Sequence, residues 1–354
     1  MKKNLGIPLA GVRVIEFEGI GPGPLAGRIL ADMGAEVTVI SRLETGEVQA
    51  QLGGSDENPL RHGKVVRPLD LKQAQARQEA LTLLGKADAL IEGNRPGVME
   101  RLGLGPADCA AINPGLVYGR ITGWGQSGPL SQAAGHDLNY VALTGLLALS
   151  AHRGERPIVP PTVVGDASGA LGLAFGIVCA LLEARTSGQG RVVDAAIVDI
   201  ASMLGGLAHW IHSSGQLGTA KPSAFHDSPF YDVYRCADGA CITLGALEPK
   251  FYALLLSKLE IDDVDVTAQY DTRQWPELKK RLEQLFLSQP RAHWCTLLEG
   301  SDVCFAPVLS LSEAAQHPHN AARGIFTTTA SGALLSSPAP RFLNLTGTLA
   351  HDSP

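Results

Sequence analysis

Short apolar runs alternate with longer segments whose apolar residues recur every three or four positions along the first half of the chain. The first pattern is typical of buried strands and the second of helices that cover a sheet. The runs that predict strands are 12–17, 36–40, 65–71, 87–92, 116–121 and 191–196. The segments that predict helices are 25–33, 73–84, 98–102 and 167–185. Strands that alternate with helices form parallel sheets, so we predict an α/β protein with a Rossmann-like doubly wound large domain.

A second pattern begins near residue 230. A strand at 241–244 is followed by helices at 249–259 and 275–287, which predicts a smaller α+β domain over 230–312. The predicted large domain is 1–190. The predicted linker is 191–229, because its second half is rich in Gly, Ser and Pro. The Pro- and Ser-punctuated tail, 313–354, is expected to return to the large domain.

The composition of the 354 residues is that of an ordinary soluble protein, with 45% hydrophobic and 18% charged residues. A formal net charge of -6 argues against a nucleic-acid binder that neutralises phosphates. The longest apolar run, 167–182, is rich in Ala and Gly and below spanning length, so we expect a buried helix and no membrane insertion. The six cysteines show no C-x-x-C spacing and the N-terminal residues lack a signal-type apolar run, so the cytoplasm is the expected location.

Two titratable residues stand on loops where regular elements begin. His136 follows Gly135 just before a helical run, and Asp166 follows Val164-Gly165 just before the longest apolar helix. An imidazole and a carboxylate that face one cavity can carry a proton across it. Each residue taken alone has a structural interpretation, because Asp is a favoured helix N-cap and Gly-His-Asp is a common surface tripeptide.

A glycine pattern, Gly21-x-Gly23-x-x-x-Gly27, follows the first strand and is similar to a loose dinucleotide fingerprint. Two interleaved prolines remove amides that would hold a pyrophosphate, and Arg42 replaces the acid that would bind a ribose. Arg42 could accept a 2′-phosphate, so an NADP-dependent reductase is one alternative.

Basic residues recur at the ends of the predicted strands and suggest a phosphate-bearing, adenine-type ligand. They are Arg42, Lys72, Arg95 and Arg101. Two histidine pairs, His209-x-x-His212 and His317-x-His319, have the spacing of metal ligands but no Cys or acid partner in register. We therefore expect no metal site.

Several strings together resemble the α-methylacyl-CoA racemases of the family III CoA-transferase superfamily. His136 is discriminating, because sister transferases usually carry Tyr there, and so is the pair Glu248-Pro249. The other strings are Gly19 to Pro24, Leu69 to Lys72, Arg95 to Val98, Glu100 to Gly105, Gly123 to Pro129, Gly135 to Tyr140, Val164 to Asp166, Val192 to Ala196 and Gly245 to Phe251. They extend over nearly the whole chain.

The resemblance implies an interlocked homodimer and assigns the site. His136 and Asp166 would be the two acid/bases, Glu248 would orient and polarise His136, and Asp137 would support the network. The residues that would line the CoA site are Arg42, Leu69, Asp70, Leu71, Lys72, Gly93, Asn94, Arg95 and Arg101. Those that would contact the pantetheine and thioester end are Gly135, Leu138, Asn139 and Tyr140.

The implied reaction interconverts (R)- and (S)-2-methylacyl-CoA thioesters by 1,1-proton transfer through an enolate. Coenzyme A would be carried by the substrate, and no other cofactor would be needed. Amides at the start of the helix near Asp166 are expected to donate to the thioester oxygen. One alternative is a CoA-transferase with Asp166 as covalent nucleophile, which leaves His136 without a role. Another is an acyl-CoA binding protein without activity.

The chain departs from the family pattern at two places. The residues after Asp166 are Ala167 to Ala170, where the family is bulkier and richer in glycine. The residues before Phe230 are His226 to Pro229, where the family usually has Gly-Gly-Ala. Both departures are expected near the acyl chain of the substrate.

Overall fold

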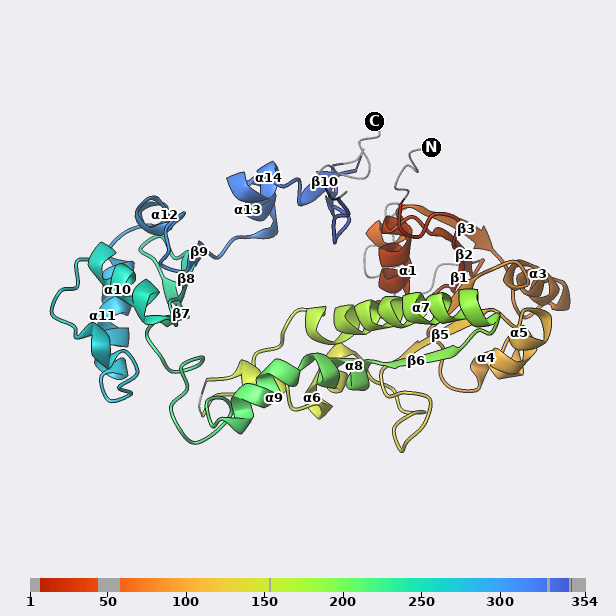
Figure 1. Cartoon of the computed structure of the whole chain (residues 1–354), viewed down its shortest axis with the longest axis horizontal. Helices are drawn as coiled ribbons and strands as arrows, with labels where there is room; N and C mark the ends of the chain where they lie inside the picture. Colours follow the sequence, from red (N-terminus) through yellow and green to blue (C-terminus); the bar gives the residue numbers. More distant parts are fainter. Residues whose placement is uncertain (1–6, 44–57, 153, 330–331, 344, 346–354) are drawn as a thin grey trace. The chain divides into compact units, whose positions relative to one another are not determined.

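The computed structural model describes residues 7–43, 58–152, 154–329, 332–343 and 345. The chain folds into two compact units (Figure 1). Unit 1 comprises Met1–Leu147, Val159–Gly205 and Leu335–Pro354. Unit 2 comprises Ala148–Ile158 and Gly206–Leu334.

A six-stranded sheet in the order β3-β2-β1-β4-β5-β6 forms the centre of unit 1. Every neighbouring pair is parallel. The strands are β1 (Arg13–Phe17), β2 (Glu36–Ser41), β3 (Lys64–Pro68), β4 (Ala89–Glu92), β5 (Val117–Thr122) and β6 (Val192–Ala196). This is the strand order of a doubly wound dinucleotide-binding fold. The prediction of an α/β fold with a parallel central sheet is therefore confirmed.

Helices cover both faces of this sheet because successive strand residues point to opposite sides. In β4, Ala89 and Ile91 pack with one cluster of buried residues, whereas Leu90 packs with another. The first cluster includes residues of α1 (Pro22–Asp32) and α7 (Ser168–Ser187), and α7 lies along β5 and β6 (Figure 1). The second cluster includes residues of α3 (Ala74–Leu84), α4 (Val98–Arg101) and α5 (Pro106–Ile112).

The strand order reverses between β1 and β4, which lie side by side although two strands separate them in the sequence. At such a switch point the loops after the two strands leave in opposite directions and open a crevice at the carboxyl edge of the sheet. The loop after β1 leads to Gly21, and the loop after β4 contains Gly93 and Arg95. Ligand chemistry in unit 1 is expected at this edge.

Unit 2 contains a three-stranded antiparallel sheet in the order β7-β8-β9. Its strands are β7 (Tyr231–Arg235), β8 (Cys241–Gly245) and β9 (Phe305–Pro307). Three helices share one buried core with it: α10 (Pro249–Lys258), α11 (Trp275–Leu287) and α12 (Arg291–Leu298). Unit 2 also contains α9 (Gly206–Ser213), α13 (Leu311–Gln316), α14 (Pro318–Ala322) and β10 (Phe326–Thr328). The partner of β10 is β11 (Leu334–Ser336), which begins at the last residue of this unit.

The boundaries of the units differ from the predicted ones. The predicted linker, 191–229, begins with β6, which pairs with β5 at the edge of the main sheet, and continues with α8 (Ile197–Leu204), which packs against α7. The large unit therefore continues to Gly205. The residues rich in Gly and Ser follow this point. The strand at 191–196 was predicted, but it was wrongly assigned to the linker. The tail rejoins unit 1 from Leu335, later than the predicted residue 313.

Within the described residues, Val163–Ser187 is the stretch long and apolar enough to cross a membrane by length and composition alone, and 39% of its most apolar window is buried. A core helix of a globular protein passes the same test. The helix packs against β5, β6 and α1, and Leu173 and Ile177 are fully buried there. Its other side carries exposed apolar residues, including Phe175.

A buried ion pair links the strands of unit 1 to the start of α1. Lys64 Nζ lies 2.5 Å from Glu16 Oε2 and donates to the Pro24 carbonyl at 2.7 Å. The two side chains are 0% and 2% exposed. Gly27 faces the pair, and a Cβ there would lie 1.9 Å from Glu16 Oε2. The last glycine of the fingerprint-like pattern therefore makes room for a carboxylate of the chain itself.

We predict that Lys64→Met lowers the free energy of unfolding by about 3–5 kcal/mol, because it leaves a buried carboxyl without its partner. The double variant Glu16→Gln/Lys64→Met should recover most of this loss in chemical denaturation. Burial raises the pKa of Glu16 to about 7 even beside Lys64. Without Lys64 the largest influence that offsets burial is lost, so the pKa of Glu16 in the folded protein rises further. The folded protein then keeps a proton that the unfolded chain releases, and the loss of unfolding free energy should grow as the pH rises through 7. Equal losses in the single and double variants would contradict this.

Candidate active site

His136 caps the N-terminus of α6 (Asp137–Leu143), directly beside the carboxyl edge of the sheet. Its backbone N–H donates to Asn139 Oδ1 at 3.0 Å, and the Asn139 N–H donates to the His136 carbonyl at 2.8 Å. This reciprocal pair fixes the backbone of His136 from both sides. The imidazole is left exposed and available to a ligand.

Asp137, the first residue of α6, is buried, with 5% of its surface exposed. Its Oδ2 accepts two backbone N–H groups, from Gly165 at 2.9 Å and from Asp166 at 2.6 Å. A Cβ at residue 165 would lie 2.5 Å from this oxygen, so the contact requires glycine there. One carboxylate thereby ties the start of α6 to the segment that carries Asp166.

Asp166 lies within a π-helical turn, Val163–Ala167, that leads into α7. The alternative interpretation of Asp166 as a helix N-cap therefore does not hold. The turn is held by the Ser168 hydroxyl, which donates to the Gly165 carbonyl at 2.8 Å. Ser168 is one of the residues at which the chain departs from the family pattern, and here it stabilises the turn. A wider turn of this kind is frequent at functional sites.

The amides near Asp166 already have acceptors within the chain. Those of Gly165 and Asp166 bind Asp137, that of Ala167 donates to the Thr162 carbonyl at 3.2 Å, and that of Ser168 donates to the Gly165 carbonyl. The expectation that they donate to a thioester oxygen is therefore wrong. The backbone N–H groups that an ordinary helix start would leave without partners are hydrogen-bonded here, within the π turn or to Asp137.

The carboxyl of Asp166 is partly buried between two other elements. A Cβ at Gly21, which has a φ of 70°, would lie 3.0 Å from Asp166 Oδ2. Burial raises the pKa of Asp166 to about 6, the charge of Asp137 adds to the rise, and the charge of His136 opposes it. His136 and Asp166 are therefore electrostatically coupled, and the start of α1 receives this carboxylate where a dinucleotide fingerprint would hold a phosphate.

A pocket of about 420 Å³ opens at the same edge. It contains six of the predicted site residues, including Arg95 and His136. Its lining in the described part of the chain is Gly93, Arg95, Pro96, Thr122, Gly123, Trp124, Ser131, Ala133, Ala134, Gly135, His136, Asn139 and Tyr140. Asp166 is outside this lining.

Tyr140 joins the pocket to Asp166. Its hydroxyl donates to the Gly135 carbonyl, and its ring meets Trp124 edge-on at 4.7 Å between centroids. A Cβ at Gly123 would lie 1.9 Å from the Tyr140 ring, so both glycines make room for it. Burial raises the pKa of Tyr140, the charge of Asp166 adds to the rise, and that of Arg95 opposes it. The charges of Arg95 and Asp166 therefore both act on the Tyr140 hydroxyl.

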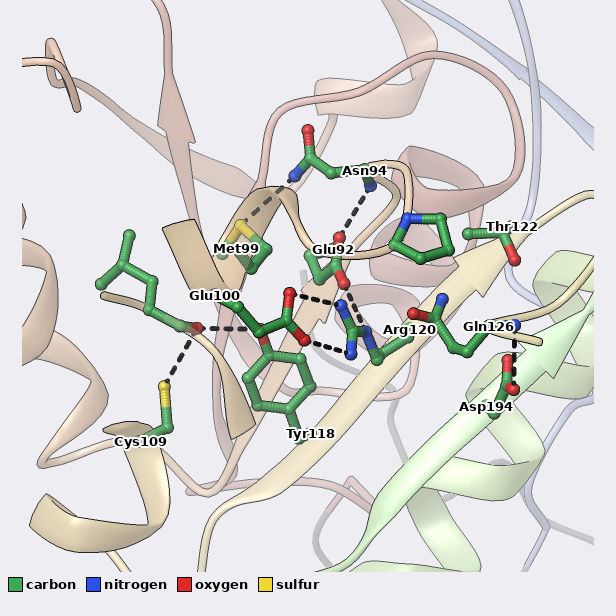
Figure 2. Close-up of polar contacts among 12 residues, drawn as sticks. Glu92, Asn94, Met99, Glu100, Cys109, Tyr118, Arg120, Thr122, Gln126 and Asp194 are labelled. Atoms are coloured by element: carbon green, nitrogen blue, oxygen red, sulfur yellow. Dashed lines mark hydrogen bonds and ion pairs between the residues drawn. The ribbon is translucent and has the colours of Figure 1, made fainter. Parts of the chain in front are cut away.

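The loop that carries Arg95 is anchored by a buried ion pair (Figure 2). Arg120 Nε donates to Glu92 Oε1 at 2.7 Å, and Arg120 Nη1 donates to Glu100 Oε1 at 2.8 Å. Glu92 and Arg120 face each other in the β4–β5 register and are 0% and 6% exposed. The other oxygen of Glu92 accepts the Asn94 N–H at 2.7 Å. Asn94, predicted to line the CoA site, serves in the described structure to shape this loop.

The other predicted CoA residues lie at the same edge but outside the pocket lining. The Arg42 N–H donates to Glu18 Oε2 at 2.9 Å, and the Lys72 N–H donates to Asp70 Oδ1 at 3.0 Å. The guanidinium of Arg101 lies against Gly97, and Arg42, Lys72, Arg101 and Leu138 are exposed. Leu69, Asp70 and Leu71 are half-buried. Their role in CoA binding stays a prediction.

Glu248 belongs to unit 2, where it is the N-cap residue of α10 and is exposed. Its predicted role toward His136 stays a prediction. The two histidine pairs have other contacts: His212 Nδ1 lies 2.7 Å from the Leu217 carbonyl, and His317 Nε2 lies 2.7 Å from Glu299. Among the described residues, no group of three or more His, Cys, Asp or Glu side chains has the arrangement of a metal site.

Sequence reasoning missed three residues that shape this edge. Trp124 lies in the string Gly123 to Pro129, which supports the family resemblance, but no role was predicted for it from the sequence. Glu92 and Arg120 each interrupt an otherwise apolar buried strand, and opposite charges on neighbouring strands were the signal that could have paired them.

Comparison with known proteins agrees with this geometry. The profile of CoA-transferase family III matches residues 9–353. Mouse alpha-methylacyl-CoA racemase is 40% identical over 335 residues, which cover 94% of this chain and 85% of the mouse protein. The human racemase is 37% identical over 339 residues, covering 95% and 87%.

A solved structure gives the same result. The crystal structure of Rv3272 from Mycobacterium tuberculosis, a probable fatty acyl-CoA transferase, superposes with a TM-score of 0.80 at 28% identity and covers 98% of this chain and 95% of that one. The resemblance found in the sequence is confirmed: the protein belongs to CoA-transferase family III, together with the α-methylacyl-CoA racemases.

Proposed function

We propose that this protein is an α-methylacyl-CoA racemase, which interconverts (R)- and (S)-2-methylacyl-CoA thioesters. The observation that carries the proposal is the coupling of His136 and Asp166. Asp137 follows His136 in the chain and holds the backbone of Asp166, and the charge of His136 acts on Asp166. The mouse and human racemases, both similar over most of their length, support the choice of reaction.

The proposed step moves one proton and no other group. One of the two residues breaks the α C–H bond and takes the proton, and the electron pair delocalises onto the thioester oxygen as an enolate. The other residue then delivers its own proton to the opposite face of the α-carbon. The pair holds one proton before and after the turnover, so the step balances and uses only CoA carried by the substrate.

The environment of Asp166 suits this exchange. A carboxyl with an ordinary pKa is almost fully ionised at neutral pH and is a poor acid. Burial raises the pKa of Asp166 to about 6, which brings it closer to the range of an imidazole. Two groups of similar proton affinity can act as acid and base in either direction, as a racemase requires.

The pocket beside His136 is the proposed place for the CoA moiety near the thioester. Arg95 supplies positive charge and Trp124 an apolar wall, both within the lining. The exposed basic residues Arg42, Lys72 and Arg101 are proposed contacts for the phosphates. Glu248 is proposed to orient His136 on the family resemblance. No metal or further cofactor is part of the proposal, and the cytoplasm stays the predicted location.

A homodimer is also part of the proposal. The outward side of α7 exposes large apolar residues, among them Leu171, Phe175 and Leu182, and Phe175 is 68% exposed. The neighbouring α8 exposes Met203 and Leu204. Exposed apolar side chains gathered on packed helices are typical of a protein interface, and a second copy of the chain is the commonest partner.

We predict that the protein incorporates deuterium at the α-position of a 2-methylacyl-CoA in deuterated water. His136→Gln and Asp166→Asn should each reduce racemisation by at least about 100-fold, because each removes one acid/base. Each variant should still exchange the α-hydrogen of one enantiomer, and the two should act on opposite enantiomers. Mass spectrometry of the resolved thioesters measures both quantities.

The outcome that contradicts a racemase is transfer of CoA to an added carboxylic acid without α-exchange. In a transferase Asp166 would attack the thioester, and hydroxylamine would trap the resulting anhydride. His136→Gln would then leave the transfer rate nearly unchanged, whereas Asp166→Asn would abolish it.

We predict that Phe175→Glu converts a dimer into a monomer, because a carboxylate buried in an apolar interface is costly. Arg185→Glu, at an exposed position on the same helix, is the control and should keep the dimer. Light scattering coupled to gel filtration measures the masses. A wild-type protein of monomer mass would contradict the proposed dimer.

A further inference from the structure

We infer that Asp137 is a positioning residue that acts through Asp166: its buried carboxylate accepts the backbone N–H groups of Gly165 and Asp166, fixes the turn that carries Asp166, and places a second carboxylate beside it. The inference rests on the proposed function for its effect on turnover. It assigns Asp137 no proton of its own to transfer, and it gives the residue two separable tasks, one geometric and one electrostatic.

The geometric task follows from where the side chain points. An Asp in the first turn of a helix commonly bonds amides of its own helix. Asp137 instead accepts N–H groups from Gly165 and Asp166, which are 28 and 29 residues away in sequence. The buried carboxylate therefore binds the neighbouring turn and not its own helix, so its role extends beyond capping α6.

The connection is also short. His136 and Asp137 are consecutive, and one hydrogen bond of 2.6 Å joins Asp137 to the backbone of Asp166. The backbones of His136 and Asp166 are therefore linked through a peptide unit, one side chain and one hydrogen bond. Gly165 admits this contact because a Cβ there would lie 2.5 Å from the accepting oxygen. Such a linkage can hold two groups at the separation that a shared α-carbon requires.

The electrostatic task follows from like charge in a partly dry site. A second carboxylate nearby disfavours ionisation of Asp166, and burial enhances the effect. Besides α7, which continues the turn that carries Asp166, three elements pack against this turn: α6, the start of α1, and α8, whose one titratable residue, Asp199, is exposed. Asp137 and His136 come from α6, and the pKa of Asp166 is raised by burial first and then by Asp137, with His136 opposing. From the start of α1 the neighbour is Gly21, which carries no charge.

Asp137→Asn separates the two tasks, because the amide oxygen can still accept the N–H groups while the charge is lost. We expect the acidic limb of the kcat/KM profile to move to lower pH by on the order of one unit. Loss of the nearby negative charge lets the Asp166 carboxyl ionise at lower pH, so the part of the profile that requires ionised Asp166 moves with it. Asp137→Ala loses both tasks and should lower kcat by about 100-fold or more with little change in KM.

A second readout does not depend on turnover. Carbon-13 NMR of aspartate-labelled protein follows the Asp166 carboxyl directly, with Asp166→Asn to assign its signal. The midpoint of this titration should move to lower pH in Asp137→Asn. Asp108→Asn is the matched control, since Asp108 is an exposed helix-start carboxylate of the same unit that accepts the Gly105 N–H at 3.0 Å. It should shift neither the limb nor the titration.

Unchanged limb and titration in a folded Asp137→Asn variant would overturn the inference. If that variant fails to fold, Gly165→Ala decides the geometric task, because it crowds the contact while keeping every charge. It should lower kcat without moving the acidic limb, and an unchanged kcat would overturn the inference. A wild-type protein without α-exchange would refute the proposed function, and the NMR titration would still decide the effect of Asp137.

Discussion

The site depends on one buried carboxylate oxygen that accepts two backbone amides. Asp137 Oδ2 receives the N–H groups of Gly165 and Asp166, and His136 precedes Asp137 in the chain. Because of this contact, two residues thirty positions apart in sequence belong to one rigid arrangement. The contact also occupies the amides of Gly165 and Asp166, which therefore do not stabilise an enolate at this turn.

The sheet supplies the platform on which this arrangement stands. The reversal of strand order between β1 and β4 opens the carboxyl edge of the sheet, where Asp166 lies against Gly21 and Arg95 lines the pocket. A second buried ion pair, Glu92 with Arg120, holds the ends of β4 and β5 in register and anchors the loop that carries Arg95. The Glu92–Arg120 pair and the Asp137 carboxylate are buried polar groups, and the fold can bury them because each is paired or hydrogen-bonded.

Relatives of this chain include both racemases and CoA-transferases. A carboxylate at residue 166 is compatible with either chemistry, as acid/base or as nucleophile. His136 lines the pocket at this edge, where the proposed racemase mechanism requires a second proton carrier. Burial raises the pKa of Asp166 to about 6.

The sequence by itself determined the strands of the main sheet, and it singled out His136 and Asp166 as the proposed acid/bases. Apolar strands with period two and helices with period 3.6 are local signals, and they predicted six of the strands that the main sheet contains. The sequence did not determine that β6 belongs to this sheet unit and not to a linker. It also did not show the π turn at Asp166, the pairing of Glu92 with Arg120, or the target of the Asp137 side chain. These features depend on which segments meet in space. The donors to a buried carboxylate can come from residues far away in the sequence, so they are fixed only in the folded chain.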